Sequence, residues 1–285
     1  MKLIMTLLVR DEADIVAKNI DFHLAQGVDF IVAIDNGSMD GTRDILSDYE
    51  RAGVAKVFDE PGRNLAQGTW VTRAALYARD ELGADWIINN DADEFWHAPN
   101  GSLKEVAEEA PASILRCPRR NMICAREALG TGSWDSQLIY YATNPVPVPV
   151  LGDFYSEALP CPYFYLALPS KAMSRAEGLV RVGQGNHHVR FKSRQAACEG
   201  EVVIYHFPIR SVGQFKKKII QGSKAYAANT DLPERVGWHW RRWYRLYEEQ
   251  GLEVALADAM PDKQRVDGDL ATGVLATDTR FAGRE

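Results

Sequence analysis

Short apolar runs alternate with segments of helical periodicity along the first hundred residues. The run Leu3–Val9 has the length of a strand, and Val16, Ile20 and Leu24 then recur at helical spacing until Gly27, a residue type that commonly ends helices. The same alternation predicts strands at 29–34, 54–58 and 85–90, and helices at 42–52 and 69–82. Strands that alternate with short helices indicate βαβ units, so we expect an α/β fold around a mainly parallel sheet.

The pattern changes after the fourth predicted strand. Ser102 and Glu105 have the spacing of a capping box that opens a short helix, and 112–117 has the character of a strand. Regularity then fades until about residue 200. The alternating prolines of 144–149 exclude a central strand and predict an extended loop, with a proline-rich ligand for another protein as the alternative.

The last part of the chain returns to regular patterns before it becomes polar. The apolar run 201–207 predicts a strand that contains His206 near its end. A helix is expected after Ser211, and a second amphipathic helix is expected over 233–249. Residues 259–285 are rich in Asp, Thr, Gly and Arg, which is typical of a loosely ordered tail.

The composition is that of an ordinary globular protein, since 46% of the 285 residues are hydrophobic. The formal charge of −6 and the pI of about 5.6 argue against a nucleic-acid partner and favour a small molecule. The four cysteines are widely spaced and lack a zinc-site or Cys-x-x-Cys pattern, so we expect reduced thiols. No apolar run suits a membrane span, and Leu3–Val9 is too short for the apolar region of a signal peptide, so a cytoplasmic protein is expected.

Two acidic clusters directly follow predicted strands. The first is Asp35-Asn36-Gly37-Ser38-Met39-Asp40-Gly41-Thr42, and the second is Asp91-Ala92-Asp93-Glu94. In open α/β sheets, ligands bind at the carboxyl ends of the strands. We therefore expect both clusters at one edge of the sheet, where they predict a nucleotide and metal site.

The second cluster suits a cation. Side chains of an extended segment alternate in direction, so Asp91 and Asp93 are expected to point to the same side. Neighbouring carboxylates repel each other unless a positive charge lies between them, and carboxylate oxygens suit Mg²⁺ or Mn²⁺. These ions fill their other positions with water and phosphate oxygens, which predicts a phosphate-bearing substrate. A solvated acidic turn that caps the next element is the alternative.

The first cluster suits a polar ligand. Gly37 and Gly41 permit tight turns, and Thr42 opens a helix whose free amide groups favour an anionic or polar group. A plain turn followed by a helix cap is the alternative. Two such clusters at the same edge of one sheet favour the site over a pair of unrelated turns.

Four motifs stand in order along the first part of the chain: Arg10-Asp11-Glu12-Ala13, Gly27-Val28-Asp29, Asp35-Asn36-Gly37-Ser38 with Asp40-Gly41-Thr42, and Asp91-Ala92-Asp93-Glu94-Phe95. Together they resemble the family 2 glycosyltransferases with the GT-A fold, and most of all the bacterial branch with the Asp-Asn-Gly-Ser and Asp-Ala-Asp-Glu-Phe motifs. The resemblance covers residues 1 to about 99 and reappears near Gly185-Asn186-His187 and Tyr205-His206-Phe207-Pro208. It implies a Rossmann-like, three-layer GT-A domain over 1–258, with a nucleotide-binding half (1–115) and an acceptor half (116–258).

The resemblance also implies transfer of a sugar from a nucleotide-diphosphate donor. Asp35 and Asn36 would lie near the base and ribose, and Asp91 near the ribose. The implied ligands of Mn²⁺ or Mg²⁺ are Asp91, Asp93, Glu94 and His206, and the further nucleotide-binding residues are Arg10, Glu12, Arg73 and Lys217. Many relatives have a second Asp where this chain has Asn36. The amide oxygen of Asn36 can accept a hydrogen bond from uracil N3–H, so a UDP-sugar is the favoured donor. Donors that contain guanine or thymine stay open.

Two of these residues have structural alternatives. His206 could instead be a core histidine bonded to the backbone, and Lys217 could belong to a solvated helix face with Lys216 and Lys218.

The reaction also needs a base for the attacking acceptor hydroxyl, either a carboxylate or an imidazole. Relatives that invert the anomeric centre use an Asp in the acceptor half, but the Glu-Asp signature that marks it is missing here. Asp135, Asp153, Glu157 and His187 are the candidates, and we take Asp153 and His187 as the predicted catalytic residues.

The tryptophan cluster at 238–243 has two readings: its indole faces line an acceptor site, or it packs in the core. Because many such enzymes use lipid-linked acceptors, a glycan or a lipid-linked acceptor with a peripheral membrane contact is a further expectation.

The predicted function is a metal-dependent, inverting glycosyltransferase. One alternative is a nucleotidyltransferase, which Arg10-Asp11-Glu12 disfavours because a glycine-rich loop is expected there. The others are a non-catalytic carbohydrate- or nucleotide-binding protein on the same fold, and a dehalogenase-like phosphatase, which Glu94-Phe95 disfavours.

Overall fold

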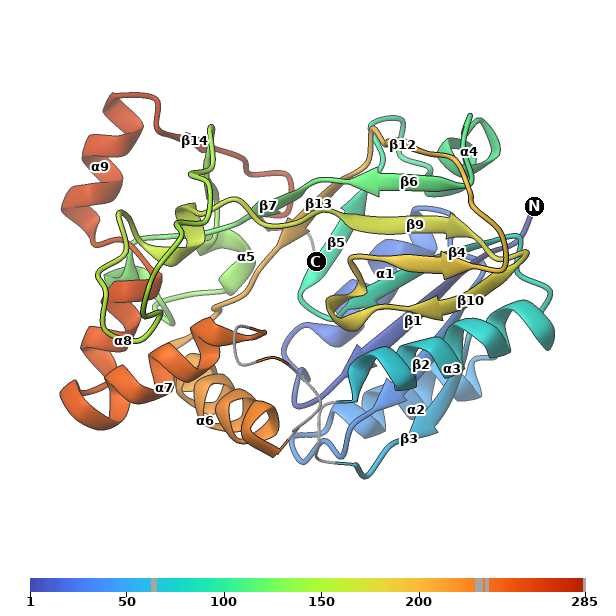
Figure 1. Ribbon diagram of the computed structural model, residues 1–285, viewed down its shortest axis with the longest axis horizontal. Coiled ribbons are helices and arrows are strands. Elements are labelled where there is room, and N and C mark those ends of the chain that lie inside the picture. Colours follow the sequence, from blue (N-terminus) through green and yellow to red (C-terminus); the bar gives the residue numbers. More distant parts are fainter. Residues whose placement is uncertain (63–65, 229–232, 234–235, 284–285) are drawn as a thin grey trace. The chain divides into compact units, whose positions relative to one another are not determined.

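The computed structural model describes residues 1–62, 66–228, 233 and 236–283 (Figure 1). Contacts divide the chain into two compact units, each built from two segments. The first unit contains Met1–Arg119 and Pro169–His206, and the second contains Arg120–Leu168 and Phe207–Glu285. The expectation of one domain over 1–258 stays a prediction.

A seven-stranded sheet forms the centre of the first unit, in the order β12-β6-β9-β4-β1-β2-β3. The pairs β4–β1, β1–β2, β2–β3 and β12–β6 are parallel, while β9 runs antiparallel to both of its neighbours. The predicted α/β fold with a mainly parallel, Rossmann-like sheet is confirmed. The strands are Leu3–Val9 (β1), Phe30–Asp35 (β2), Ala55–Asp59 (β3), Trp86–Asp91 (β4), Ile114–Cys117 (β6), Lys171–Arg175 (β9) and Ala197–Glu199 (β12).

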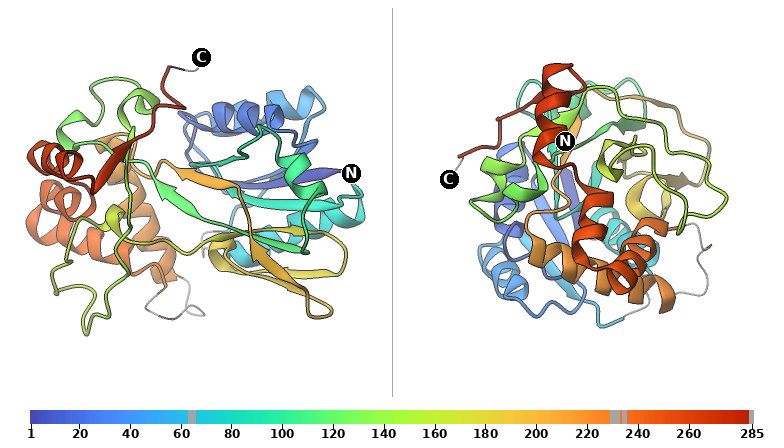
Figure 2. Two further views of the ribbon diagram at one scale, coloured as in Figure 1. Left: turned by 90° about the horizontal axis from the view of Figure 1, so that it is seen from above. Right: turned by 90° about the vertical axis from the view of Figure 1, so that its left-hand side faces the viewer.

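The central strands β1, β2 and β4 are mainly apolar and are buried over nearly all of their length because both faces of the sheet are covered. On one face, Ile4, Val32 and Ile87 pack with Trp70 and Ala74 of α3. Figure 2 shows the blue helices α1 and α2 on one side of the sheet and the yellow β10–β11 hairpin on the other. The bounds are Val16–Ala25 (α1), Thr42–Arg51 (α2), Gln67–Asp80 (α3), Leu179–Val182 (β10) and Val189–Phe191 (β11).

Smaller elements complete the first unit. The strand Glu94–His97 (β5) pairs antiparallel with Val203–His206 (β13). The strand Arg119–Asn121 (β7) begins at the last residue of the unit's first segment. The predicted capping box opens α4 (Leu103–Glu108), since the Ser102 hydroxyl accepts a hydrogen bond from the Glu105 amide at 3.1 Å. A short 3₁₀ turn, Gln184–Asn186, joins β10 to β11.

The second unit is mainly helical. Its core contains Trp243, which is 1% exposed and lies 4.9 Å from Tyr163 between ring centroids, so the tryptophan cluster packs inward at this residue. The helix expected over 233–249 is observed from Trp238, and residues 234–235 of that expectation lie outside the described residues. The elements are Trp134–Gln137 (α5), Val212–Ala228 (α6), Trp238–Gln250 (α7), Leu252–Ala259 (α8), Lys263–Ala271 (α9), Tyr140–Ala142 (β8) and Leu275–Thr277 (β14), with 3₁₀ turns at Arg126–Ala128 and Tyr163–Tyr165.

Three expectations about the remaining segments can be compared with the structure. Residues 259–285, expected to be a loosely ordered tail, contain α9 and also β14, which pairs with β8. The proline-rich stretch 144–149 is extended, with one isolated bridge from Val146 to Leu166. All four cysteines are free. In the described part of the chain, no helix has the length and apolar character needed to cross a bilayer.

Candidate functional site

Two acidic residues end strands that flank β1. Asp35 is the last residue of β2 and lies opposite Val9 of β1, while Asp91 is the last residue of β4 and lies opposite Leu8. Neighbouring strands are about 4.8 Å apart, so the two positions are separated by about 10 Å across the sheet edge. The expectation that the two clusters share one edge is therefore met at Asp35 and Asp91.

Asp35 presents an acceptor atom with no partner in the described structure. Its Oδ2 atom accepts from the Ser38 amide at 3.1 Å, but the buried Oδ1 atom has no hydrogen bond among the described residues. The Asn36 side chain next to it is fixed, because Nδ2 donates to the carbonyls of Glu60 and Gly62 at 2.8 and 2.6 Å. This buried carboxylate oxygen is therefore available, among the described residues, to accept a hydrogen bond.

The rest of the first cluster braces the loop after β1. Its polar side chains accept hydrogen bonds from three successive backbone amides of that loop. These bonds are Asp11 N to Ser38 Oγ at 2.9 Å, Glu12 N to Thr42 Oγ1 at 2.9 Å and Ala13 N to Asp40 Oδ2 at 3.2 Å. Ser38, Asp40 and Thr42 thus hold the segment that carries two predicted nucleotide-binding residues, Arg10 and Glu12.

Two predicted nucleotide-binding arginines lie in the first unit. Arg10 directly follows β1, between the positions of Asp35 and Asp91, and its buried Nε atom has no hydrogen bond in the described structure. The half-exposed Arg73 pairs with Glu60 at 3.2 Å, the residue whose carbonyl holds Asn36. Of the two, only Arg10 directly follows a strand of the central sheet, since Arg73 lies on α3.

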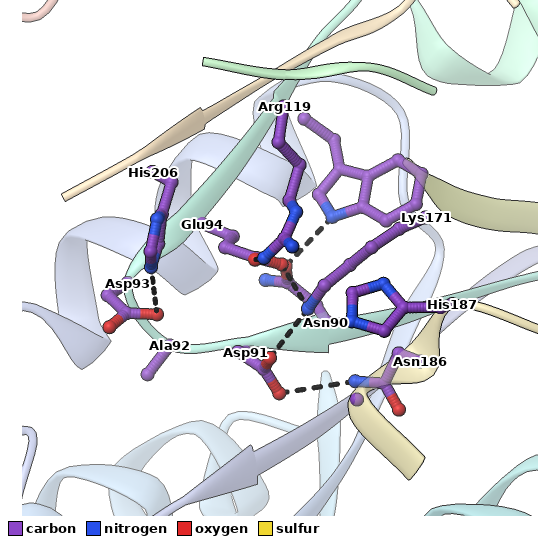
Figure 3. Close-up of polar contacts among 12 residues, drawn as sticks. Asn90, Asp91, Ala92, Asp93, Glu94, Arg119, Lys171, Asn186, His187 and His206 are labelled. Carbon is purple, nitrogen blue, oxygen red and sulfur yellow. Dashed lines mark hydrogen bonds and ion pairs between the residues drawn. The ribbon is translucent and has the colours of Figure 1, made fainter. Parts of the chain in front are cut away.

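The second cluster forms a tight turn and not an extended segment. Ala92 and Asp93 are the turn residues between β4 and β5. Figure 3 shows the Asp93 carboxylate turned toward His206, while Asp91 faces Lys171 and Asn186. The expectation that Asp91 and Asp93 point to the same side is therefore wrong, because alternation applies to strands and the chain turns here.

Asp91 is surrounded by donors. Its Oδ2 atom lies 2.5 Å from Lys171 Nζ, and its Oδ1 atom accepts from Asn186 Nδ2 at 3.1 Å and from Gln67 Nε2 at 3.3 Å. Asn186 is fully buried and adopts a positive φ of 61°. The turn between β10 and β11 therefore holds Asp91 from one side and β9 holds it from the other.

Glu94 is buried between two cations. Its Oε1 atom lies 3.1 Å from Arg119 Nη1, and Lys171 Nζ is in close contact with its Oε2 atom (Figure 3). Only 1% of the Glu94 side chain is exposed. Burial raises the pKa of Glu94, and the neighbouring Lys171 opposes that rise.

The donor atoms present fit a divalent cation at one part of the predicted metal set. Asp93 Oδ1 and His206 Nε2 are 3.8 Å apart, both side chains are about nine-tenths buried, and an oxygen and an imidazole nitrogen suit Mn²⁺. Asp91 and Glu94 do not fit, because Lys171 already fills the space between them. In the described part of the chain, no group of three or more His, Cys, Asp or Glu residues is arranged to hold a metal.

The predicted catalytic residues lie in different units. In the first unit, the His187 Nδ1 atom is 3.2 Å from the carbonyl of Ser170, so Nδ1 carries the hydrogen and Nε2 is left as an acceptor. Burial, together with Arg119 and Lys171, lowers the pKa of His187 to about 3. The imidazole is therefore neutral at physiological pH.

Asp153, in the second unit, has local partners for both carboxylate oxygens. Oδ1 accepts from the Tyr155 amide at 2.8 Å, and Oδ2 accepts from the Ser156 hydroxyl at 2.6 Å. The bond from Ser156 and the further bond from Tyr155 lower the pKa of Asp153. Lys217 also lies in the second unit, on the exposed face of α6.

Sequence reasoning missed Lys171, Gln67 and Asn186 as partners of Asp91. Lys171 is 80 residues from Asp91 in the chain, in a stretch without clear periodicity. The only signal for Asn186 was the Gly185-Asn186-His187 motif, which the resemblance had marked without a role.

Comparisons with known proteins find one family model and several solved structures. The family model "Glycosyl transferase family 2" matches residues 7–124. TarS 1-349 of S. aureus has 12% sequence identity and a TM-score of 0.42, and the match covers 88% of this chain and 73% of that chain. In a structure of a longer TarS chain, the match covers 44% of that chain. HddC of Yersinia pseudotuberculosis has 10% sequence identity and a TM-score of 0.35. The match covers 73% of this chain and 95% of that chain. No curated protein matches.

These structural likenesses lie below a TM-score of 0.5, so the assignment rests on the family match together with the sheet. The matched segment contains the end of β1, all of β2 and β4, and both acidic clusters. The resemblance to family 2 glycosyltransferases is confirmed by this match, which extends over residues 7–124.

Proposed function

We propose that this protein transfers a sugar from a nucleotide-diphosphate donor to an acceptor hydroxyl, with a divalent cation at the diphosphate and inversion of the anomeric centre. The carrying observation is the placement of Asp35 and Asp91 on either side of β1 at one sheet edge, within the segment that matches the family. A gap of about 10 Å suits a nucleoside, with its base at one carboxylate and its ribose at the other.

Asp35 is the proposed acceptor for the base. Its unpartnered Oδ1 atom would accept N3–H of uracil, or N1–H of guanine, at a site where the side chain of Asn36 is already fixed. A charged acceptor makes a stronger hydrogen bond than a neutral one, so this contact would contribute much of the nucleoside affinity. UDP is the favoured nucleotide.

The diphosphate end is proposed to lie at Asp93, His206 and Arg10. Asp93 and His206 supply two ligands for Mn²⁺ or Mg²⁺, and the donor phosphates and water would supply the rest. When bound, such a cation stabilises the negative charge of the departing nucleotide. The guanidinium of Arg10, with its unpartnered Nε atom, would add a second positive charge at the same strand end.

His187 is the proposed contact for the attacking hydroxyl, and Asp153 stays the second candidate. The neutral His187 offers its Nε2 lone pair, and it follows Asn186, which contacts the Asp91 side chain. Since positive neighbours disfavour the imidazolium form, His187 would orient the hydroxyl by accepting its hydrogen bond. The hydroxyl proton would pass to water as the bond from the acceptor oxygen to the sugar forms, and the bond from the sugar to the diphosphate would break to release the nucleotide diphosphate. A glycan or lipid-linked molecule is the proposed acceptor class.

The test is calorimetry with UDP and GDP, each with and without Mn²⁺, on the parent and on three variants. UDP-GlcNAc, a ligand in one of the TarS structures, serves as a first donor probe. We expect Asp35→Asn to weaken nucleotide binding at least tenfold because one charged hydrogen bond is lost. Asp93→Ala should lose only the gain in affinity that Mn²⁺ provides. Asp48→Asn, the same chemical change at an exposed surface residue, is the matched control.

Equal nucleotide binding in the parent and Asp35→Asn would remove Asp35 from the base site. Equal Mn²⁺ dependence in the parent and Asp93→Ala would remove Asp93 from the metal site. Slow release of the sugar from a bound donor into water separates an enzyme from a non-catalytic binding protein.

A further inference from the structure

Lys171 is a fully buried lysine with a functional neighbour. It is the first residue of β9, and 1% of its side chain is exposed. A buried ammonium group is costly unless it is paired and hydrogen-bonded. Its described partners are Asp91 and Glu94, one on each side.

Charges balance around this lysine. Two carboxylates, Asp91 and Glu94, meet two cations, Lys171 and Arg119. Arg119 contacts Glu94 and the carbonyl of Pro169, so among the described contacts Lys171 is the cation that joins the two carboxylates. Oxygens that contact one nitrogen lie within about 5 Å of each other, a separation at which uncompensated carboxylates repel strongly.

We propose that Lys171 is a positioning residue that acts as an internal cation. Its ammonium group occupies the place between Asp91 and Glu94 where a divalent metal was expected, and it thereby directs the Asp91 carboxylate toward the donor's ribose. The ribose part of this inference rests on the proposed function. The part that concerns the cation between the carboxylates stands on the contacts alone.

The chemistry of an ammonium group suits this role. It is compact and carries three N–H donors, so it can donate to oxygens on different residues. Since it is covalently attached, the pair of carboxylates is held at any metal concentration. Gln67 and Asn186 donate to the remaining oxygen of Asp91, which fixes the rotation of that carboxylate.

Loss of the lysine charge would leave a vacancy for a cation. Lys171→Met keeps a side chain of similar length but removes the ammonium group, so Asp91 and Glu94 would face each other without the charge between them. A divalent ion could then bind where the parent protein has no room for one. Lys171→Arg keeps the charge on a larger, planar group that cannot occupy the same point.

The experiment measures thermal unfolding with and without Mn²⁺, and it measures UDP affinity by calorimetry. The proteins are the parent, Lys171→Met, Lys171→Arg and the double variant that combines Lys171→Met with Glu94→Gln. Lys56→Met is the matched control, because Lys56 pairs with Glu50 at the surface of the same unit. We expect Lys171→Met to unfold at lower temperature and to regain stability with Mn²⁺ in the absence of nucleotide. The double variant should lose that Mn²⁺ response, and Lys171→Arg should fold with UDP affinity reduced at least tenfold.

The inference is overturned if Mn²⁺ stabilises Lys171→Met no more than it stabilises Lys56→Met. If Lys171→Met does not fold even with Mn²⁺, Lys171→Arg decides: parent-like UDP affinity in that variant also overturns the inference. Failure of the parent to bind any nucleotide would instead refute the proposed function, while the Mn²⁺ response of Lys171→Met would still support the internal cation.

Discussion

Individual buried polar residues explain why the acidic turn from Asp91 to Glu94 has its shape. Asn19 of α1 donates to the carbonyls of Ala92 and Glu94 at 3.0 and 2.7 Å, and it accepts from Asn90 at 3.0 Å. His23, one turn later, receives a hydrogen bond from the backbone amide of Trp96 at 3.1 Å. These contacts fix the turn that separates Asp91 from Asp93. The sequence showed α1 through its apolar residues, but the polar residues on the same helix carried no signal.

His23 leads to a prediction about pH. Its Nδ1 atom donates to the Asn19 carbonyl at 2.7 Å and Nε2 accepts from Trp96, so the folded protein needs the neutral ring. Burial lowers the pKa of His23 from 6.5 to about 4. Between these values the unfolded chain binds a proton that the folded chain excludes, so the free energy of unfolding falls as pH falls through this window. The loss approaches about 3 kcal/mol near pH 4.

Denaturant unfolding from pH 7.5 to 4.5 checks this expectation in the parent and in His23→Gln, whose side chain does not titrate. The variant should depend less on pH, although some dependence remains because His187 also has a lowered pKa, about 3. The exposed His188→Gln is the control and should follow the parent. An unchanged pH dependence in His23→Gln would show that His23 does not titrate as argued.

At the scale of elements, the sequence predicted what local pattern controls. β1 and β2 are mainly apolar and β4 begins with the apolar run 86–88, because helices or a hairpin cover both faces of the sheet. A glycine follows each connecting helix within three residues of its end. β9 was missed because its five residues, Lys171–Arg175, include three polar ones and follow a long irregular stretch. Its place between β4 and β6 comes from pairing with distant strands, which periodicity does not reveal.

The start of α2 gives a test in which one substitution has opposite effects at two sites. Gly41 is the N-cap residue and has φ +93°, while Gly268 lies inside α9 with an ordinary φ; neither would bring a new Cβ within 4 Å of another group. Gly41→Ala should therefore lower the free energy of unfolding by about 1–2 kcal/mol because of backbone strain. Gly268→Ala should raise it by about 0.5–1 kcal/mol through helix propensity. Chemical denaturation measures both, and an equal sign at the two sites would contradict the assigned backbone geometry.

At the scale of the whole molecule, the two compact units are interleaved along the chain. The first unit is interrupted by Arg120–Leu168, and Pro169–His206 then returns to supply Lys171, Asn186 and His206 to the site. Sequence motifs located the first half of this site, at Asp35 and Asp91, because both residues end predictable strands. The returning half depends on which segments pack together over long separations, so it could not be read from local pattern, and only His206 and His187 were anticipated there.

This organisation predicts where a bound nucleotide protects the chain. A ligand at one hundred times its dissociation constant stabilises the unit that holds it by about 2.7 kcal/mol, which slows amide exchange through opening of that unit about 100-fold. With UDP and Mn²⁺, hydrogen exchange should slow in β1, β2, β4 and β13, while α9 keeps its rate because it belongs to the other unit. The Asp35→Asn protein, measured at the same nucleotide concentration, should show much less protection. Slowing confined to α6 through α9 would move the nucleotide to the second unit and favour Lys217 over Asp35 as its contact.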